Sequence, residues 1–419
     1  MPTVKELRQI FASGPADQLA ASAGLSLNSR LPLAASRSAR FVWYMTNDVL
    51  GLVAGPQEEG KVDEALAVGL GERADRRLVL VLPVGWHEPT LHRSAWLRPD
   101  LDLQIWTHDW NDGGTLDKSA VVQATRPDRA HTLAVVESTE KPPLYLGSKT
   151  PWVEDLMRWA GEEMDLDPSH RQDVRAWQCR GQRVLAIRSK GTGLSIVAGI
   201  NWGSSSLNKT HPDPLTVNAE MSGATLATAK ANIEAGVHER MAGVAKKNDE
   251  HWLQAVLRRH PKVLGLEQPV LRELPAWRPQ GFSKKGQDRG RGFVDLAGLD
   301  ATGRLLLVET KLGVDDMLVL QGLDYYIWAE ANRARLTTRL DCRPDVDFEI
   351  SYCVGDKEGK EPQLSRHAKG QLNALADDIR WHVQLVSDWV GDNPTADRFP
   401  LRLVPPPPPL KTGPGAKTG

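Results

Sequence analysis

The chain has 419 residues, more than a single hydrophobic core usually organises, so we expect two compact units and a tail. Hydrophobic residues make up 41% of the chain and charged residues 25%, a composition typical of globular proteins that excludes a wholly disordered chain. The formal net charge is −1, so the chain lacks the general basic character of many polyanion-binding proteins, and any such contact has to be local.

The sequence contains no membrane or disulfide signature. Its longest apolar run, around residues 78–82, is far shorter than the roughly 18 residues that a membrane-spanning helix needs. The first residues lack the apolar region and small-residue cleavage site of a secretory signal. The three cysteines, Cys179, Cys342 and Cys353, are too widely spaced for a disulfide framework or a Cys-x-x-Cys metal site. We therefore expect a cytoplasmic protein with no membrane partner.

The first half of the chain alternates short apolar runs with helical patterns, which is typical of strands joined by crossover helices. The strand-like runs are residues 41–45, 78–83, 133–136, 184–187 and 194–200. The helical patterns cover residues 62–73 and 152–163. We expect a separate N-terminal α/β domain over residues 1–204.

Residues 201–214, NWGSSSLNKTHPDP, have no hydrophobic period and favour an interdomain linker. We expect a linker and bridging helix over residues 205–235, with a helical composition that extends over residues 222–247. A second domain then covers residues 236–403. The tail, residues 404–419, contains five consecutive prolines and cannot build a core, so we expect it to be disordered.

The second domain begins with a short amphipathic helix after Asn248, which ends at His260 and Pro261. Its apolar stripe consists of Trp252, Leu253, Val256 and Leu257. Glu250 lies one turn before Leu253, so its carboxylate projects along the apolar face of the helix. A glutamate in that position needs a polar partner inside the protein.

An apolar segment around residues 263–271 and a glycine-rich loop come next, and then two strands, residues 292–299 and 304–312, form a hairpin. The connecting turn is DATG, and a turn centred on its middle bond places Asp295 opposite Val308. Asp295 then lies within one residue of Glu309. The two carboxylates should therefore be close together.

Period-2 geometry sends Glu309 and Lys311 to the same face of their strand, beside Asp295. A buried carboxylate pair repels itself unless a cation lies beside it, and an oxygen-only ligand set suits Mg²⁺ or Mn²⁺. Taken alone, Glu-x-Lys is a weak signal, because a surface strand that ends in alternating charges explains it equally well. Two further copies, Glu59–Lys61 and Glu358–Lys360, lie in polar, loop-like stretches.

Two more features flank this hairpin. Lys284, Lys285, Arg289 and Arg291 form a glycine-interleaved basic loop that leads directly into the strand of Asp295. A solvated mobile loop is the alternative interpretation of its composition. After the hairpin, residues 314–333 favour a helix on which Gln321 and Tyr325 are four residues apart on one face. The alternative for this pair is an incidental polar edge on a core helix.

This order of elements resembles the PD-(D/E)XK nuclease superfamily: a helix with Glu, a strand with Asp, a strand with Glu-x-Lys, and a helix with Gln-x-x-x-Tyr. The matching residues are Glu250, Asp295, Glu309, Lys311, Gln321 and Tyr325. Within the superfamily, EHWLQAVLRRHPKVLG at 250–265 looks like the helix of Shedu-type antiphage nucleases, and also like that of mismatch-type endonucleases. The resemblance covers about residues 245–390. The chain departs from it at Val294, where proline is common, and at His260, where Asn is common.

The resemblance implies a restriction-endonuclease-like core, a central mixed sheet flanked by helices. It implies Mg²⁺, for which Mn²⁺ can substitute, held by Asp295, Glu309 and the backbone carbonyl of Thr310. Glu250 would orient Lys311 or bind a second ion, and Lys311 would place or deprotonate a water. Gln321, Tyr325 and the basic loop would contact DNA. Because one site cuts one strand, double-strand cleavage implies a homo-oligomer such as a dimer or tetramer.

Other functions stay open on the sequence. The nuclease-like part could be a catalytically inactive module that binds nucleic acid or a protein, or a DNA-repair endonuclease of the mismatch type. By analogy with Shedu-type proteins, residues 1–204 would sense or regulate. A separate enzyme in that half is disfavoured, because His87, His92 and His108 follow no metal-ligand spacing that we recognise.

Overall fold

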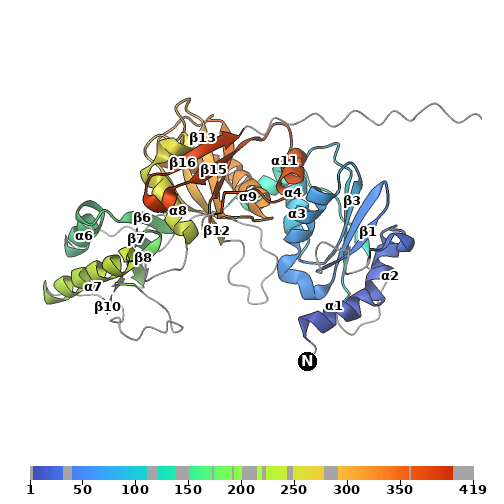
Figure 1. The fold of residues 1–419 in the computed structure, drawn as a ribbon, viewed down its shortest axis with the longest axis horizontal. Coiled ribbons are helices and arrows are strands. Elements are labelled where there is room, and N and C mark those ends of the chain that lie inside the picture. Colours follow the sequence, from blue (N-terminus) through green and yellow to red (C-terminus); the bar gives the residue numbers. More distant parts are fainter. Residues whose placement is uncertain are drawn as a thin grey trace, which may run out of the picture.

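The protein is an α/β protein whose strands form three separate sheets of five, five and six strands. The structure is a computed structural model, and it describes residues 3–31, 40–110, 121–137, 151–171, 174–190, 193–200, 215–218, 223–242, 249–277, 291–357 and 360–399. We call the parts that carry the three sheets the first unit (described residues 3–137), the middle unit (151–242) and the third unit (249–399). Figure 1 shows the third unit between the other two. Residues 1–204, expected to form one N-terminal domain, therefore contribute to two sheets, and the second sheet extends beyond them to a strand at Leu215–Asn218.

The first unit is built on parallel strands with crossover helices, as its alternating pattern predicts. Strands β2, β3 and β4 are parallel, and β1 and β5 pair antiparallel at the edges. The strands are β1 (Phe41–Met45), β2 (Val49–Ala54), β3 (Arg77–Pro83), β4 (Leu103–His108) and β5 (Val122–Gln123). The helices are α1 (Val4–Ala12), α2 (Pro15–Ser22), α3 (Asp63–Glu72), α4 (Glu88–Ser94) and α5 (Arg129–Val136).

The prediction of a strand at residues 133–136 is wrong, because these residues form the last turn of helix α5. Asp128 is the N-cap of this helix, and its carboxylate accepts a hydrogen bond from the backbone N–H of His131 at 2.7 Å. A run of four apolar residues fits a buried helical turn as well as a strand. The capping aspartate upstream is the signal that distinguishes the two.

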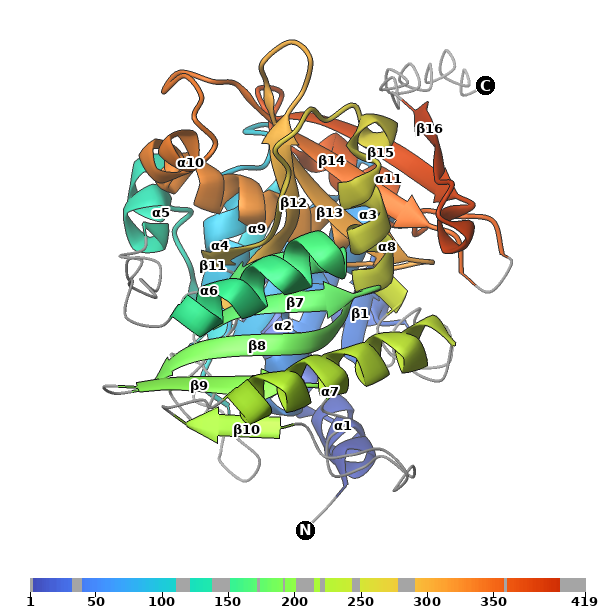
Figure 2. The same ribbon diagram turned by 90° about the vertical axis from the view of Figure 1, so that its left-hand side faces the viewer.

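The middle unit is an antiparallel sheet in the order β10-β9-β8-β7-β6, with two helices on one face (Figure 2). Its elements are α6 (Pro151–Arg158), β6 (Asp167–Arg171), β7 (Val174–Cys179), β8 (Gln182–Lys190), β9 (Gly193–Ala198), β10 (Leu215–Asn218) and α7 (Gly223–Met241). Trp159, Ile187 and Ile233 belong to the core that joins the helices to the sheet. This core is separate from that of the other two units.

The third unit is a six-stranded mixed sheet in the order β11-β12-β13-β14-β15-β16. Strands β13, β14 and β15 are parallel, and the other neighbours are antiparallel. The strands are β11 (Leu271–Trp277), β12 (Arg291–Leu299), β13 (Leu305–Leu312), β14 (Phe348–Gly355), β15 (Arg380–Ser387) and β16 (Thr395–Phe399). The helices are α8 (Asp249–Arg259), α9 (Leu318–Ala331), α10 (Arg333–Arg339) and α11 (Ala368–Ala374). Leu253 and Leu257 of α8 share a core cluster with Val308 of β13.

The predicted hairpin of β12 and β13 is present, but its register differs from the prediction by one residue. Val308 pairs with Leu296 instead of Asp295. The backbone N–H of Asp300 donates to the carbonyl of Arg304 at 2.8 Å, so the connection has three residues between them and is centred on Thr302. Gly303 takes the left-handed conformation (φ +81°) that such a three-residue loop needs. In this register Asp295 comes opposite Glu309, one residue beyond the last pair.

Helix α9 is enclosed on all sides, because every residue from Leu318 to Ala329 is buried. One side of it packs on β13 and β14, and the first unit covers another side through α4 and α5. A helix that is apolar all round is stable only when it is covered all round. The first and third units therefore share one hydrophobic core. In the described part of the chain, no helix combines the length and the apolar character that crossing a membrane requires.

A buried ion pair joins the two units across this core. The guanidinium of Arg93, on α4, donates to the carboxylate of Asp324, on α9, through Nε and Nη2, each at 2.7 Å. Both side chains are fully buried. Asp63 on α3 also contacts Arg93, at 2.8 Å. Removing one partner of such a pair leaves an uncompensated charge in the interior.

We expect Arg93→Met to lower the free energy of unfolding by about 3–5 kcal/mol, because Asp324 loses its counter-ion. Urea titration followed by tryptophan fluorescence measures the change. The double variant Arg93→Met with Asp324→Leu should recover most of the loss. Arg77→Met is the matched control, because Arg77 and Asp102 form an exposed pair that should contribute no more than about 1 kcal/mol. Equal losses in the two single variants would contradict the role of the buried pair.

Candidate functional site

The candidate site lies in the third unit, at the end of the hairpin where pairing between β12 and β13 stops. The last paired residues toward this end are Leu296 and Val308. Asp295 and Glu309 follow directly, and both are buried, with 8% and 2% of their surface exposed. The side chains of Asp295 and Glu309 are thus buried at the same end of the hairpin. The sequence predicts this closeness.

The ammonium group of Lys311 lies among oxygen atoms from two elements. Its Nζ is 2.7 Å from Oε1 of Glu309 and 3.0 Å from the carbonyl oxygen of Thr310. Helix α8 contributes Glu250, whose Oε1 is 3.3 Å from the same Nζ. Glu250 therefore has the polar partner that its place on the apolar face of α8 predicts. The oxygens of Glu309 and Thr310 that were expected to hold a metal ion here contact an amine.

Asp295 is held by Thr310 on the neighbouring strand. The backbone N–H and the hydroxyl of Thr310 both donate to Oδ2 of Asp295, each at 2.7 Å. Gln254, on α8, donates from Nε2 to the Thr310 hydroxyl at 3.1 Å and is fully buried. Neither Gln254 nor the hydroxyl of Thr310 was predicted to contribute to the site. A signal was present, since Gln254 follows Glu250 by four residues and so lies on the same helix face.

Burial and like charge dominate the electrostatics of the cluster. Burial, followed by the negative charge of Asp295, raises the pKa of Glu309 well above its ordinary value. Burial likewise raises the pKa of Glu250, although the nearby ammonium opposes it. Burial alone would lower the pKa of Lys311, but the surrounding carboxylates outweigh it and raise the pKa, so the amine keeps its proton.

The residues present fit a hard divalent cation. Glu309 uses Oε1 for Lys311, while its Oε2 is buried and has no hydrogen-bond donor among the described residues. This orphan carboxylate oxygen belongs to a cluster that also contains the Asp295 carboxylate and the Thr310 carbonyl, and oxygen ligands are the type that Mg²⁺ prefers. No group of three or more His, Cys, Asp or Glu side chains is arranged to hold a metal ion within the described ranges. Asp295, Glu309 and the carbonyl of Thr310 form a smaller donor set, with two carboxylates and one carbonyl.

The remaining residues predicted for the site belong to helix α9 or to the basic loop. Gln321 and Tyr325 are on the enclosed helix α9 and are 7% and 5% exposed, so in this conformation neither is free to contact a nucleic acid. They therefore do not line an open groove, because the first unit covers their helix. Arg291 begins strand β12, and its side chain lies outside the described residues. Lys284, Lys285 and Arg289 also lie outside the described residues.

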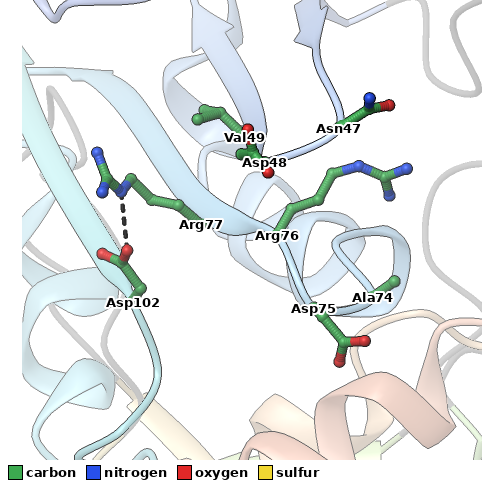
Figure 3. Close-up of a pocket in the computed structure, with 8 residues that line it drawn as sticks. All are labelled: Asn47, Asp48, Val49, Ala74, Asp75, Arg76, Arg77 and Asp102. Atoms are coloured by element: carbon green, nitrogen blue, oxygen red, sulfur yellow. Dashed lines mark hydrogen bonds and ion pairs between the residues drawn. The ribbon is translucent and has the colours of Figure 1, made fainter. Parts of the chain in front are cut away.

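Two cavities are present elsewhere in the protein. One, of about 640 Å³, lies at the amino-terminal ends of β3 and β4, and Figure 3 shows Arg77 paired with Asp102 on its wall. The other, of about 700 Å³, lies between the first and third units and is lined by Arg40, Arg366 and neighbouring residues. Neither cavity is lined by the cluster around Lys311.

No family model matches the chain, and the comparison with curated proteins gave no match.

The raised pKa of Glu309 predicts a pH-dependent stability. The ionised carboxylate is disfavoured in the fold, so stability is fully present below the ordinary glutamate pKa and is lost as pH rises toward the raised value. Glu309→Gln removes this charge while its amide oxygen can still accept from Lys311. At pH 8 with chelator, the variant should have a Tm higher by roughly 2–4 °C, and the difference should shrink at pH 5.

Glu267→Gln is the matched control for this measurement, because Glu267 is half exposed and lies 3.9 Å from the surface residue Lys262. Its Tm should follow that of the unchanged protein at both pH values. Differential scanning fluorimetry provides the comparison. A Glu309→Gln protein that is less stable than the parent by the same amount at both pH values would contradict the electrostatic description.

Proposed function

We propose that the protein is a Mg²⁺-dependent nuclease that hydrolyses DNA phosphodiester bonds. The observation that carries the proposal is the convergence of Glu250, Glu309 and Lys311, from a helix and a strand, with Nζ–oxygen distances of 2.7 and 3.3 Å. Asp295 completes the acidic set from the neighbouring strand. Metal-assisted phosphodiester hydrolysis needs oxygen ligands for the metal, which the carboxylates offer, and it gains from a cation beside the phosphate, which Lys311 offers.

The topology of the third unit supports a restriction-endonuclease-like core. Helix α8 precedes an antiparallel run of strands, β11 to β13, and α9 leads to the parallel neighbour β14. The mixed sheet is flanked by α8 on one face and α9 on the other. This is the order of elements on which the resemblance to PD-(D/E)XK nucleases rests.

Each residue then has a defined part in the reaction. Asp295, Glu309 and the carbonyl of Thr310 would hold Mg²⁺, which supplies Lewis acidity at the scissile phosphate. Lys311 keeps its proton, so in this arrangement it serves as a donor that orients the attacking water and neutralises negative charge that develops on phosphate oxygens. Glu250 holds the ammonium from the helix side.

A role in prokaryotic antiphage defence is the biological part of the proposal, and it rests on the Shedu-type resemblance of α8. Under the same proposal, the first and middle units sense or regulate, and subunits assemble so that two sites cut both strands. A mismatch-type repair endonuclease predicts a different substrate preference. Incubation with plasmid, linear, mismatched and single-stranded DNA, each with Mg²⁺, Mn²⁺ or chelator, distinguishes these activities from simple binding.

Lys311→Ala should reduce Mg²⁺-dependent cleavage by at least about 100-fold, because charge that develops in the transition state loses its donor. Binding of DNA, measured by fluorescence anisotropy, should change little. The matched control is Lys360→Ala, which alters an exposed lysine in another Glu-x-Lys sequence. Cleavage that persists in the Lys311 variant would remove the assignment. Loss of cleavage in both variants would show that the effect is not specific to the site.

The basic loop gives a second test of the proposal. Replacing Lys284, Lys285, Arg289 and Arg291 together with Ala should weaken binding of duplex DNA and lower the slope of log affinity against log salt by about 3.6, if each cation contacts one phosphate. Anisotropy titrations between 50 and 200 mM salt, roughly the range over which counter-ion release is measurable, give this slope. An unchanged slope would show that the loop does not contact DNA.

A further inference from the structure

A chain of polar contacts, buried except at the half-exposed His251, leads away from Asp295 toward the middle unit. The hydroxyl of Thr310 donates to Asp295 at 2.7 Å, and Gln254 donates to that hydroxyl at 3.1 Å. Thr310 and Gln254 are both fully buried. The hydroxyl can donate only one proton, so the donated bond from Gln254 directs this proton toward Asp295.

The other end of Gln254 is fixed by two donors. Its Oε1 lies 3.0 Å from Nδ1 of His251 and 3.5 Å from Nη2 of Arg272, which also donates to the carbonyl oxygen of His251 at 2.9 Å. These contacts fix the orientation of the amide, with its oxygen toward Arg272 and its nitrogen toward Thr310. From Gln254 through the Thr310 hydroxyl to Asp295, each group therefore donates to the next.

The middle unit completes the chain through Glu273. Oε1 of Glu273 lies 3.5 Å from Nδ1 of His251, and its Oε2 accepts from Nε2 of Gln178, on β7, at 3.1 Å. Gln178 also donates to Ser169 on β6 at 2.9 Å. Glu273 has a positive φ of 50°, a strained conformation for this residue. The surrounding contacts hold it against that strain.

A second contact fixes the middle unit against the same helix. Gly181, at the tip of the β7–β8 hairpin, lies so close to α8 that an added Cβ would be 2.4 Å from the carbonyl carbon of His251. The guanidinium of Arg180 stacks on Trp252 at 4.6 Å, and Arg240 donates to the carbonyl of Arg180 at 2.7 Å. The first turn of α8, which carries Glu250, is thus held by the middle unit.

We propose that Gln254 is a positioning residue that fixes the carboxylate of Asp295 through Thr310, and that the middle unit fixes Gln254 in turn through Gln178, Glu273 and His251. The inference deepens the proposed nuclease function, on which it rests. Removing a residue that hydrogen-bonds to a metal-ligating side chain and orients it commonly lowers metal affinity by roughly 10- to 100-fold. A shift of the middle unit would consequently alter the site without a direct contact to the substrate.

Gln254→Met tests the proposal, because methionine has a similar length and suits a helix but cannot donate to Thr310. Gln384→Met is the matched control, since Gln384 is a buried glutamine that donates to the carbonyl of Leu264 at 3.1 Å, on another part of the sheet. Two readouts are used on the full-length protein. Hydrogen exchange of peptides from residues 305–312 is measured without metal, and Mn²⁺ binding is measured by electron paramagnetic resonance.

We expect Gln254→Met to speed exchange at Thr310 and to weaken Mn²⁺ binding about tenfold relative to Gln384→Met. Gln178→Met, which is remote from the site, should change both quantities in the same direction by less. Identical exchange and Mn²⁺ affinity in the Gln254 and Gln384 variants would overturn the positioning role while leaving the nuclease proposal intact. If the protein without substitutions binds no Mn²⁺, the proposed function is overturned. The role of Gln254 in metal binding is then overturned as well.

Discussion

Buried negative charge at the end of the β12–β13 hairpin is the constraint on which the site depends. Asp295 and Glu309 are both almost fully buried, and their mutual repulsion disfavours the ionised form of Glu309. The ammonium group of Lys311 offsets part of this negative charge. It remains protonated because the carboxylates surround it and raise its pKa. Such an arrangement costs stability, and proteins retain unfavourable charge of this kind mainly where it has a function.

Local patterns in the sequence predicted much of the site, because a hairpin brings distant residues together by simple geometry. The strands of Asp295 and Glu309, and the partner required by Glu250, follow from period and polarity alone. The register was wrong by one residue, because the turn has three residues and is centred on Thr302 rather than on the bond before it. A single glycine with positive φ, Gly303, decides between the two turns, and glycine at the last loop position was the sequence signal for the three-residue turn.

Contacts between the units could not be predicted in the same way. The helix at residues 314–333 was expected to present Gln321 and Tyr325 to a ligand, whereas α9 is shorter and is covered by the first unit. Apolar and aromatic residues on every side of this helix were the available signal, although Gln321 and Asp324 interrupt them. The partner of Asp324 is Arg93, 231 residues earlier, and no periodicity links residues so far apart.

The shared core of the first and third units has a consequence for how the chain reaches its native state. During synthesis the first unit leaves the ribosome well before α9, the helix that its α4 and α5 cover, has been translated. Until then Arg93 lacks Asp324, its buried counter-ion on α9, and the apolar surface around it is exposed. The core of the first unit thus remains incomplete while the middle unit is synthesised. It is completed only when α9, the helix that follows the Glu-Thr-Lys strand, packs against it.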